Sequence, residues 1–173
     1  MFITLNDEQM LRIWRRRAGL EPALAEASIE RFDGLEVNEC LFHRMRAWYL
    51  DYLANAPVDT VPVSDLTERA RVSPGAVAHQ WKITAAADVA RLTALELDGV
   101  GFVPLLDPTA DENKELLRKL ANRFVRQGSQ TVGLYVPRSD TIVVHSAKMP
   151  LVKNLRGVEI TQDDTYIIDE RLA

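Results

Sequence analysis

The chain has 173 residues, of which 47% are hydrophobic and 27% are charged. This length and composition fit one ordinary globular domain, or one domain with an appendage, and exclude a fibrous or wholly disordered protein. The formal net charge of -4 argues against a nucleic-acid binder whose affinity is driven by electrostatics. The single cysteine, Cys40, cannot form an internal disulfide, so we expect a reducing compartment.

The first residues give no sign of export. The N-terminus turns polar within six residues and lacks a basic stretch followed by a long apolar run, so a secretory signal is not expected. The longest apolar runs, such as residues 103–106, are far shorter than the roughly 20 residues that a membrane-spanning helix needs. We therefore expect a cytoplasmic protein with no membrane partner.

Three helices are predicted in residues 1–57. The first runs from about Asp7 to Arg17 behind a capping box of Asn6 and Gln9. Its three terminal arginines, residues 15–17, are placed where cations favour the helix dipole. A second helix is expected over residues 21–34, because proline is tolerated in a first turn and glycine ends a helix.

The third helix, from Asn38 to Asn55, has the clearest pattern. Its apolar residues recur at intervals of three and four, which is typical of an amphipathic helix packed on a core: Leu41, Met45, Trp48, Tyr49 and Tyr52. The helix carries more apolar surface than two short helices easily cover, so we expect part of it to face other protein chains.

Aromatic residues and arginines are the types enriched in interface hot spots. On this basis the predicted partner interface lies on the third helix and has five members: Trp48, Tyr49, Tyr52, Arg44 and Arg46. The simpler interpretation, that these are ordinary core residues, stays open.

Residues 58–173 change to short β-like runs separated by turn residues. Asp98-Gly99 is a strong hairpin signal within residues 95–103. A second hairpin is predicted where residues 132–136 and 141–146 flank a turn rich in Pro, Ser and Asp.

One helix interrupts this β region. Thr109 and Glu112 have the spacing of a capping box, and helical periodicity continues up to Gly128. Two further short strands are expected at residues 158–160 and 166–168. Helices first and strands afterwards predict an α+β fold: an N-terminal helical bundle followed by a mostly antiparallel, hairpin-rich β region with one inserted helix. The expected regions are residues 1–57 and 58–173, which may also form a single domain.

Residues 64–81 fit two structures. Strands at residues 66–72 and 76–83 would flank Ser73-Pro74-Gly75 as a hairpin, which is the predicted structure. The segment also superficially resembles a helix-turn-helix, although Arg71 stands where that motif has its turn glycine. A DNA-binding regulator that uses residues 64–81 is therefore kept as the alternative function, and nucleic acid is an expected partner only under it.

The residue types needed for catalysis or metal binding are scattered. His43, His79 and His145 are isolated from one another, and no zinc or phosphate-binding motif is present. His145 and Ser146 are neighbours on a strand and point to opposite faces, so they cannot act together as base and nucleophile. The C-terminal carboxylates Asp163, Asp164, Asp169 and Glu170 are interpreted as a solvated edge. We predict no catalytic, cofactor-binding or metal-binding residue; an enzyme would need a pocket that gathers His79 or His145 with carboxylates.

In chain order, the sequence has helices that include the aromatic stretch LFHRMRAWYL at residues 41–50. The stretch WKITAAADVARL at residues 81–92 then leads into the sheet, and a hairpin follows at residues 95–103. This order resembles that of the adaptor, or head-tail connector, proteins, which form a ring beneath the portal of short-tailed bacteriophages. Where that family has a proline before its aspartate, this chain has Ala86 or Ala87.

The resemblance spans most of the chain and is architectural. It implies a non-enzymatic structural protein of virion assembly, found in the cytoplasm or in the virion and without a cofactor. Its helices would pack against copies of itself in a ring or other oligomer, and its C-terminal segment would reach another assembly protein.

Overall fold

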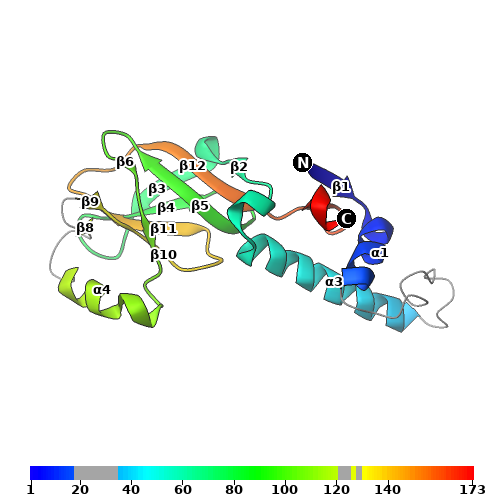
Figure 1. Cartoon of the computed structure of the whole chain (residues 1–173). Helices are drawn as coiled ribbons and strands as arrows, with labels where there is room; N and C mark the ends of the chain where they lie inside the picture. Colours follow the sequence, from blue (N-terminus) through cyan, green and yellow to red (C-terminus); the bar gives the residue numbers. More distant parts are fainter. Residues whose placement is uncertain (18–34, 121–125, 128–129) are drawn as a thin grey trace. The chain divides into compact units, whose positions relative to one another are not determined.

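The computed structural model describes residues 1–17, 35–120, 126–127 and 130–173. The chain divides into two compact units, which are described one at a time. Unit 1 comprises Met1–Pro62 and Ile160–Ala173, and unit 2 is the continuous segment Val63–Glu159 between them. Figure 1 shows helices together with mostly antiparallel strands, which confirms the mixed α and β class.

The described residues of unit 1 form two α-helices and a two-stranded sheet. Its elements are β1 (Phe2–Leu5), α1 (Asp7–Arg17), α3 (Leu35–Asn55), the 3-10 turn η2 (Val58–Thr60), β13 (Tyr166–Asp169) and the 3-10 turn η5 (Glu170–Leu172). β1 and β13 are antiparallel, with Phe2 opposite Asp169 and Leu5 opposite Tyr166. The two chain ends therefore lie side by side, as Figure 1 shows.

The start of α1 confirms the predicted capping box. The Gln9 N–H donates to Asn6 Oδ1 at 2.9 Å, and the Asn6 N–H donates to Gln9 Oε1 at 3.0 Å. These reciprocal bonds satisfy two backbone donors that a helix start otherwise leaves unpaired. The helix runs over Asp7–Arg17, the predicted bounds.

Two other expectations for unit 1 differ from the structure. The described residues hold α1, α3 and a two-stranded sheet instead of a three-helix bundle; the helix expected over residues 21–34 lies outside the described residues. Residues 160–173 were grouped with the β region, but they belong to unit 1 because β13 pairs with β1.

Arg15 lies in the last turn of α1 with Arg16 and Arg17, as predicted, and its side chain is only 2% exposed. Burial lowers the pKa of its guanidinium, because a charged group loses hydration there. The helical spacing of Arg15 places it on the buried side with Leu11.

In the described part of unit 2 there are two main sheets, a small two-stranded sheet and one short α-helix. The five-stranded sheet has the order β3 (Ala70–Pro74), β4 (Gln80–Ala85), β11 (Thr141–His145), β10 (Gly133–Tyr135) and β7 (Leu105–Leu106). The four-stranded sheet has the order β2 (Ser64–Asp65), β12 (Val152–Glu159), β5 (Val89–Leu97) and β6 (Gly101–Phe102). The remaining elements are η3 (Thr67–Arg69), η4 (Asp111–Asn113), α4 (Lys114–Leu120), β8 (Arg126–Gln127) and β9 (Gln130–Thr131). Among the strands of the described residues, only β7 and β10 pair in parallel.

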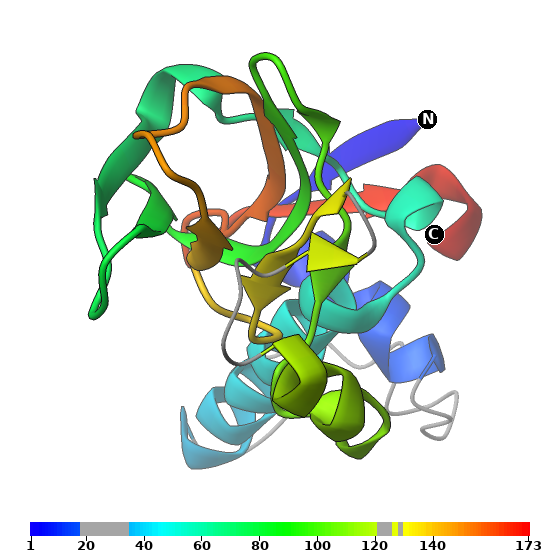
Figure 2. The same cartoon turned by 90° about the vertical axis from the view of Figure 1, so that its left-hand side faces the viewer.

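Both sheets bury one face in a common core. Figure 2 shows their strands curving around the interior of unit 2, with α4 outside them. Fully buried residues come from each sheet, among them Ile83 and Ile142 from one and Leu95 and Leu155 from the other. Tyr135 adds a buried polar link, since its hydroxyl accepts from the Leu92 N–H and donates to the Ser139 carbonyl, both at 2.8 Å.

The two hairpins predicted from turn chemistry are confirmed. β5 and β6 pair across the Asp98-Gly99 turn, where Gly99 has a φ of +76° that glycine adopts without steric cost. β10 and β11 pair with Tyr135 opposite Ile142. In both cases the residues that specify the turn are adjacent in sequence.

Residues 64–81 form strands, so the helix-turn-helix alternative is wrong. β3 and β4 are antiparallel neighbours, with Val72 opposite Ile83. The loop between them covers residues 75–79, slightly later than expected, and Gln80 closes it: its backbone carbonyl accepts from the Gly75 N–H and its side-chain Oε1 from the Ala76 N–H, both at 2.7 Å. Strand pairing and this loop replace the hydrogen bonds that two helices would have supplied.

The inserted helix begins later than its sequence predicted. α4 covers Lys114–Leu120 and follows η4, whereas the capping box placed its start at Thr109. Asp107 accounts for the difference, because its Oδ1 accepts from both the N–H and the hydroxyl of Thr109. Thr109 therefore completes an Asx turn and does not cap the helix. The helix was expected to continue up to Gly128; residues 121–125 lie outside the described residues, but Arg126–Gln127 form the strand β8, so the expectation is wrong there.

A glycine on β12 provides a direct test of packing between β12 and β5. A Cβ at Gly157 would lie 2.8 Å from the Arg91 backbone oxygen and 3.0 Å from Leu66 Cδ1. Since backbone on the neighbouring strand cannot easily move, we expect Gly157→Ala to lower the free energy of unfolding by roughly 1–3 kcal/mol. Urea denaturation would measure this change. Lys153→Ala on the same strand removes an ion pair with Glu96 in which the lysine side chain is 64% exposed, and it should cost about 1 kcal/mol or less; equal losses in both variants would contradict the packing argument.

Candidate functional site

The structure separates the five residues predicted as a partner interface. Tyr49 is completely buried and Tyr52 is 9% exposed, so within the chain they are core residues. Arg46 is mostly covered, Trp48 is half-buried and Arg44 is exposed. The aromatic face of α3 is thus largely occupied by unit 1 itself, and only part of it reaches the surface.

Arg46 is held by the loop that leads into β13. Its guanidinium donates to the backbone carbonyls of Thr161, Gln162 and Thr165, the latter two at 3.1 and 3.3 Å. It also lies over the rings of Tyr49 and Tyr166, 5.4 and 5.3 Å from their centroids. A cation placed among three carbonyl oxygens and two aromatic faces fixes this loop to α3.

Tyr49 fixes β13 itself. Its hydroxyl accepts from the Ile167 N–H at 2.9 Å and donates to the Ile167 carbonyl at 3.3 Å. Its ring meets that of Tyr166 edge-on at 5.0 Å. Burial and a hydrogen bond to Asp7 raise the pKa of Tyr166 to about 12. The backbone N–H and carbonyl of Ile167, on the side of β13 that does not pair with β1, therefore have their hydrogen-bond partner on α3.

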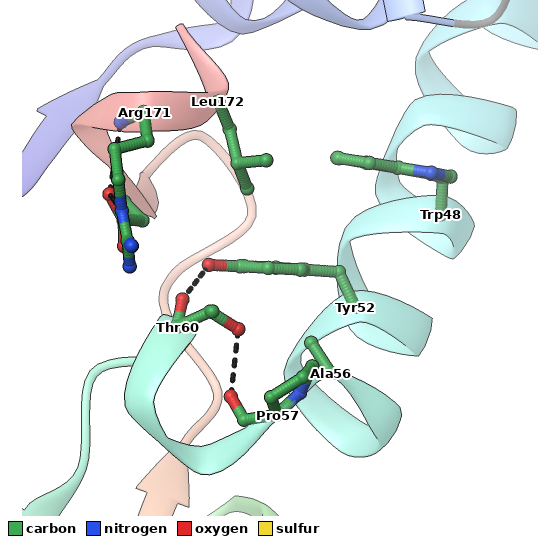
Figure 3. Close-up of a pocket in the computed structure, with 8 residues that line it drawn as sticks. Trp48, Tyr52, Ala56, Pro57, Thr60, Arg171 and Leu172 are labelled. Atoms are coloured by element: carbon green, nitrogen blue, oxygen red, sulfur yellow. Dashed lines mark hydrogen bonds and ion pairs between the residues drawn. The ribbon is translucent and has the colours of Figure 1, made fainter.

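A pocket of about 380 Å³ opens beside this core, entirely within unit 1. It is lined by residues from the end of α3, from η2 and from the last turn of the chain: Trp48, Tyr52, Ala56, Pro57, Thr60, Asp169, Arg171 and Leu172. Trp48 and Tyr52 stack with their centroids 5.8 Å apart and their planes 6° from parallel. Figure 3 shows Leu172 facing Trp48 across the pocket, while the Tyr52 hydroxyl points away to donate to the Thr60 carbonyl.

An ion pair between Asp169 and Arg171 forms the polar edge of the pocket. Arg171 Nε lies 3.0 Å from both carboxylate oxygens of Asp169, and Arg171 Nη2 binds Asp169 Oδ2. Asp169 is only 3% exposed, so it is not part of the solvated edge expected from sequence, whereas Asp163, Asp164 and Glu170 are exposed. Most of the Arg171 side chain, 67%, remains exposed. The carboxylate therefore holds a guanidinium in place at the pocket mouth.

This ion pair predicts an acid-sensitive stability. Hydrogen bonds from Arg171 lower the pKa of Asp169 to about 2, below the ordinary value of 3.8. A carboxyl with a lowered pKa in the folded state contributes stability above pH 3.8, and this contribution is lost as the pH falls toward 2. We therefore expect the stability difference between wild type and Asp169→Asn to shrink between pH 4 and pH 2 in urea titrations. Asp164→Asn, which removes an exposed carboxylate from unit 1, should show no such trend; a constant difference for Asp169→Asn would refute the assignment.

Unit 2 presents a different kind of surface at the end of β5. Three exposed apolar residues, Val100, Phe102 and Leu151, form what we call the apolar knob, and their exposed fractions are 51%, 61% and 60%. Phe102 pairs with Glu96, and the Leu151 carbonyl accepts from the Asp98 N–H at 2.9 Å, so both border the same strand end. Val100 occupies the turn between β5 and β6.

Of the residues weighed for catalysis, His79 and His145 have neighbouring backbones: the Ser146 N–H donates to the His79 carbonyl at 2.8 Å, and His145 is opposite Gln80 on β4. His43 and His79 are exposed, and His145 is half-buried on β11, where burial lowers the pKa of its imidazole. None of the three lines the pocket of unit 1. Within the described ranges, no group of three or more His, Cys, Asp and Glu residues is arranged to hold a metal ion. Cys40 lies on α3.

The pocket was missed from sequence because its lining comes from residues 48–60 and 169–172. The only local signal was the aromatic stripe of α3.

None of the helices in the described part of the chain is long and apolar enough to span a membrane. Comparisons with protein-family models, with curated proteins and with solved structures find no match for this chain.

Proposed function

We propose that this chain is a non-enzymatic assembly protein that associates with copies of itself and with other structural proteins, as a head-tail connector ring subunit does. The observation that carries the proposal is a pair of apolar surfaces on the two units. Unit 1 has an open pocket with stacked aromatic walls, and unit 2 has the apolar knob. Clustered apolar and aromatic surface of this kind is typical of sites that bind other proteins.

The chemistry of the pocket supports the same function. Its walls are mainly hydrophobic and aromatic, and its one acidic group, Asp169, is bound to Arg171. A carboxylate held this way accepts hydrogen bonds and is a poor proton donor or acceptor near neutral pH. Such a pocket is suited to holding an apolar side chain of a partner.

The architecture also agrees with the resemblance noted from sequence. After the short strand β1, the helices α1 and α3 precede the hairpin-rich sheet region of unit 2.

Measurement of the mass in solution tests the proposed function. Sedimentation velocity of the full chain over a range of concentrations should show oligomers larger than a dimer, and negative-stain electron microscopy should show closed rings. Closed rings are expected because a repeated head-to-tail contact closes when its rotation permits. A strict monomer at high concentration would overturn self-association.

A further inference from the structure

We infer that the outer edge of β1 pairs with the β1 strand of a second copy, antiparallel and centred on Ile3, so that two copies share one four-stranded sheet. This inference deepens the proposed function and rests on it, since it names one contact through which copies associate. The occupant of the edge is a second copy of this chain, and the contact has the same strand on both sides, so it is two-fold symmetric.

The backbone groups of Phe2 and Thr4 point away from β13. The Glu170 N–H donates to the Met1 carbonyl at 2.9 Å, so Met1 directs its carbonyl at the C-terminal strand. Because this direction alternates along an antiparallel strand, Phe2 and Thr4 turn their N–H and carbonyl groups to the other edge. Among the described strands, β13 is the one that pairs with β1, so this other edge meets no strand.

The other outer strands of the main sheets and of unit 1 carry features that prevent pairing with another chain. On β13, the outward groups of Ile167 are bound by the Tyr49 hydroxyl. In unit 2, β3 contains Arg71 and Pro74, and β2, β6 and β7 have two residues each. Charged residues, proline and short length are the usual means of protecting a strand edge. β1 has four residues, Phe2–Leu5, with no charge and no proline, so its edge is open to pairing.

A second copy of β1 matches this edge in the number and spacing of its groups. In an antiparallel pair centred on Ile3, Phe2 of each copy lies opposite Thr4 of the other, and each such pair exchanges two backbone hydrogen bonds. Every outward N–H and carbonyl of both strands is then satisfied. A shift by two residues in one direction would need the backbone of Asn6, which already binds within the start of α1, and a shift in the other direction would leave Thr4 unpaired.

The side chains of β1 suit the same pairing. Phe2 is 40% exposed and Thr4 is exposed on one face, and Ile3 is half-buried on the other. Pairing places the aromatic ring opposite the threonine, and Ile3 opposite its own copy; aromatic and β-branched side chains are favourable partners across strands. Since β1 carries no charged side chain, two copies bring no like charges together. An uncharged, apolar edge therefore favours its own copy over a charged segment of another protein.

A two-fold contact has a consequence for assembly. It uses the β1 edge of both copies at once, so it joins copies in pairs and cannot by itself add a third. The larger oligomers of the proposed function then need a second kind of contact, made elsewhere on the surface.

Thr4→Pro tests the hydrogen bonds of this edge. Proline has no N–H and is accepted in a strand where that N–H faces outward, so the pairing of β1 with β13 is kept while a donor is lost from each copy. The dissociation constant of self-association, measured by sedimentation of the full chain, should rise roughly 10-fold or more. Thr4→Val keeps the N–H and a β-branched side chain, and as the matched control it should change this constant by less than about 3-fold. Phe2→Pro removes the other outward donor, for use if Thr4→Pro alters folding.

Disulfide trapping tests the register, in a Cys40→Ser background that removes the single native cysteine. Ile3→Cys would place two cysteines directly opposite each other, with Cα atoms about 4.5 Å apart, a distance that a disulfide bridges. Leu5→Cys is the matched control, because Leu5 lies on the same face of β1 and is also half-buried. Its two copies would be offset by about 14 Å along the strands. On mild oxidation, Ile3→Cys should therefore form a cross-linked dimer roughly 10-fold faster or more than Leu5→Cys.

The outcomes separate this contact from self-association in general. Equal cross-linking of the two cysteine variants would overturn the register and with it this inference. Unchanged self-association of Thr4→Pro would also overturn it and would leave the edge for an extended segment of a different protein. Both results leave self-association in place. A monomeric wild type at all concentrations would instead overturn the proposed function together with this contact.

Discussion

Replacing Tyr49 with alanine should cost unit 1 about 3–5 kcal/mol of its free energy of unfolding, the range for large aromatic side chains lost from a core. Tyr49 is completely buried, and it contacts both Tyr52 and Tyr166. Its hydroxyl also satisfies the N–H and the carbonyl of Ile167. Alanine would leave a cavity together with two unpaired backbone groups on β13.

Tyr49→Phe separates these two contributions. It keeps the ring and removes the hydroxyl, so its expected cost is about 1–3 kcal/mol, the penalty for an unsatisfied buried donor. Tryptophan fluorescence during urea unfolding measures both variants. Trp14 and Trp48 lie in unit 1 and Trp81 lies in unit 2, so a Trp81→Phe background reports on unit 1 alone. Tyr49→Ala with the stability of wild type would show that β13 is held by other contacts.

The second large effect concerns Arg46. We expect Arg46→Ala to lower the free energy of unfolding of unit 1 by roughly 2–4 kcal/mol, because it removes several charge-assisted hydrogen bonds and two cation–π contacts at once. Arg46→Lys should recover only part of this loss, since an ammonium cannot reach three carbonyl groups with the planar geometry of a guanidinium.

Arg44→Ala is the matched control for this measurement. Arg44 lies two residues earlier on the same helix and is exposed, so its replacement should change stability by less than about 0.5 kcal/mol. Hydrogen exchange of the Ile167 amide adds a local readout: it should quicken in Arg46→Ala and stay unchanged in Arg44→Ala. Equal stability of the two arginine variants would refute a structural role for Arg46.

Local features of this fold could be predicted from sequence. The Asn6–Gln9 capping box, the Asp98-Gly99 turn and the 137–140 turn each depend on a few adjacent residues, and all three are found in the structure. These features can be recognised in the sequence because the hydrogen bonds that define them join residues only a few positions apart.

Long-range features could not be predicted in this way. A strand was expected at residues 166–168, where β13 lies, but its pairing with β1 was not, because partners such as Phe2 and Asp169 are far apart in sequence. The role of Arg46 was missed for a different reason: its partners are backbone carbonyls, which carry no residue-type signature. The aromatic residues of α3 were correctly recognised as an unusually apolar set, but the sequence could not show that β13 covers Tyr49.

The division of unit 1 into two segments bears on the order in which the chain folds during synthesis. All of unit 2 is translated between Pro62 and Ile160, so its sheets can form while unit 1 still lacks β13. Until Tyr166–Asp169 emerge, Tyr49 and Arg46 have no strand or loop to bind, and the aromatic face of α3 stays uncovered. Closing unit 1 then requires an ordering step across about 100 intervening residues, whose entropic cost is lower once unit 2 is compact. Synthesis of Tyr166–Asp169 is thus the step that completes the hydrogen bonding of Tyr49 and the burial of its ring.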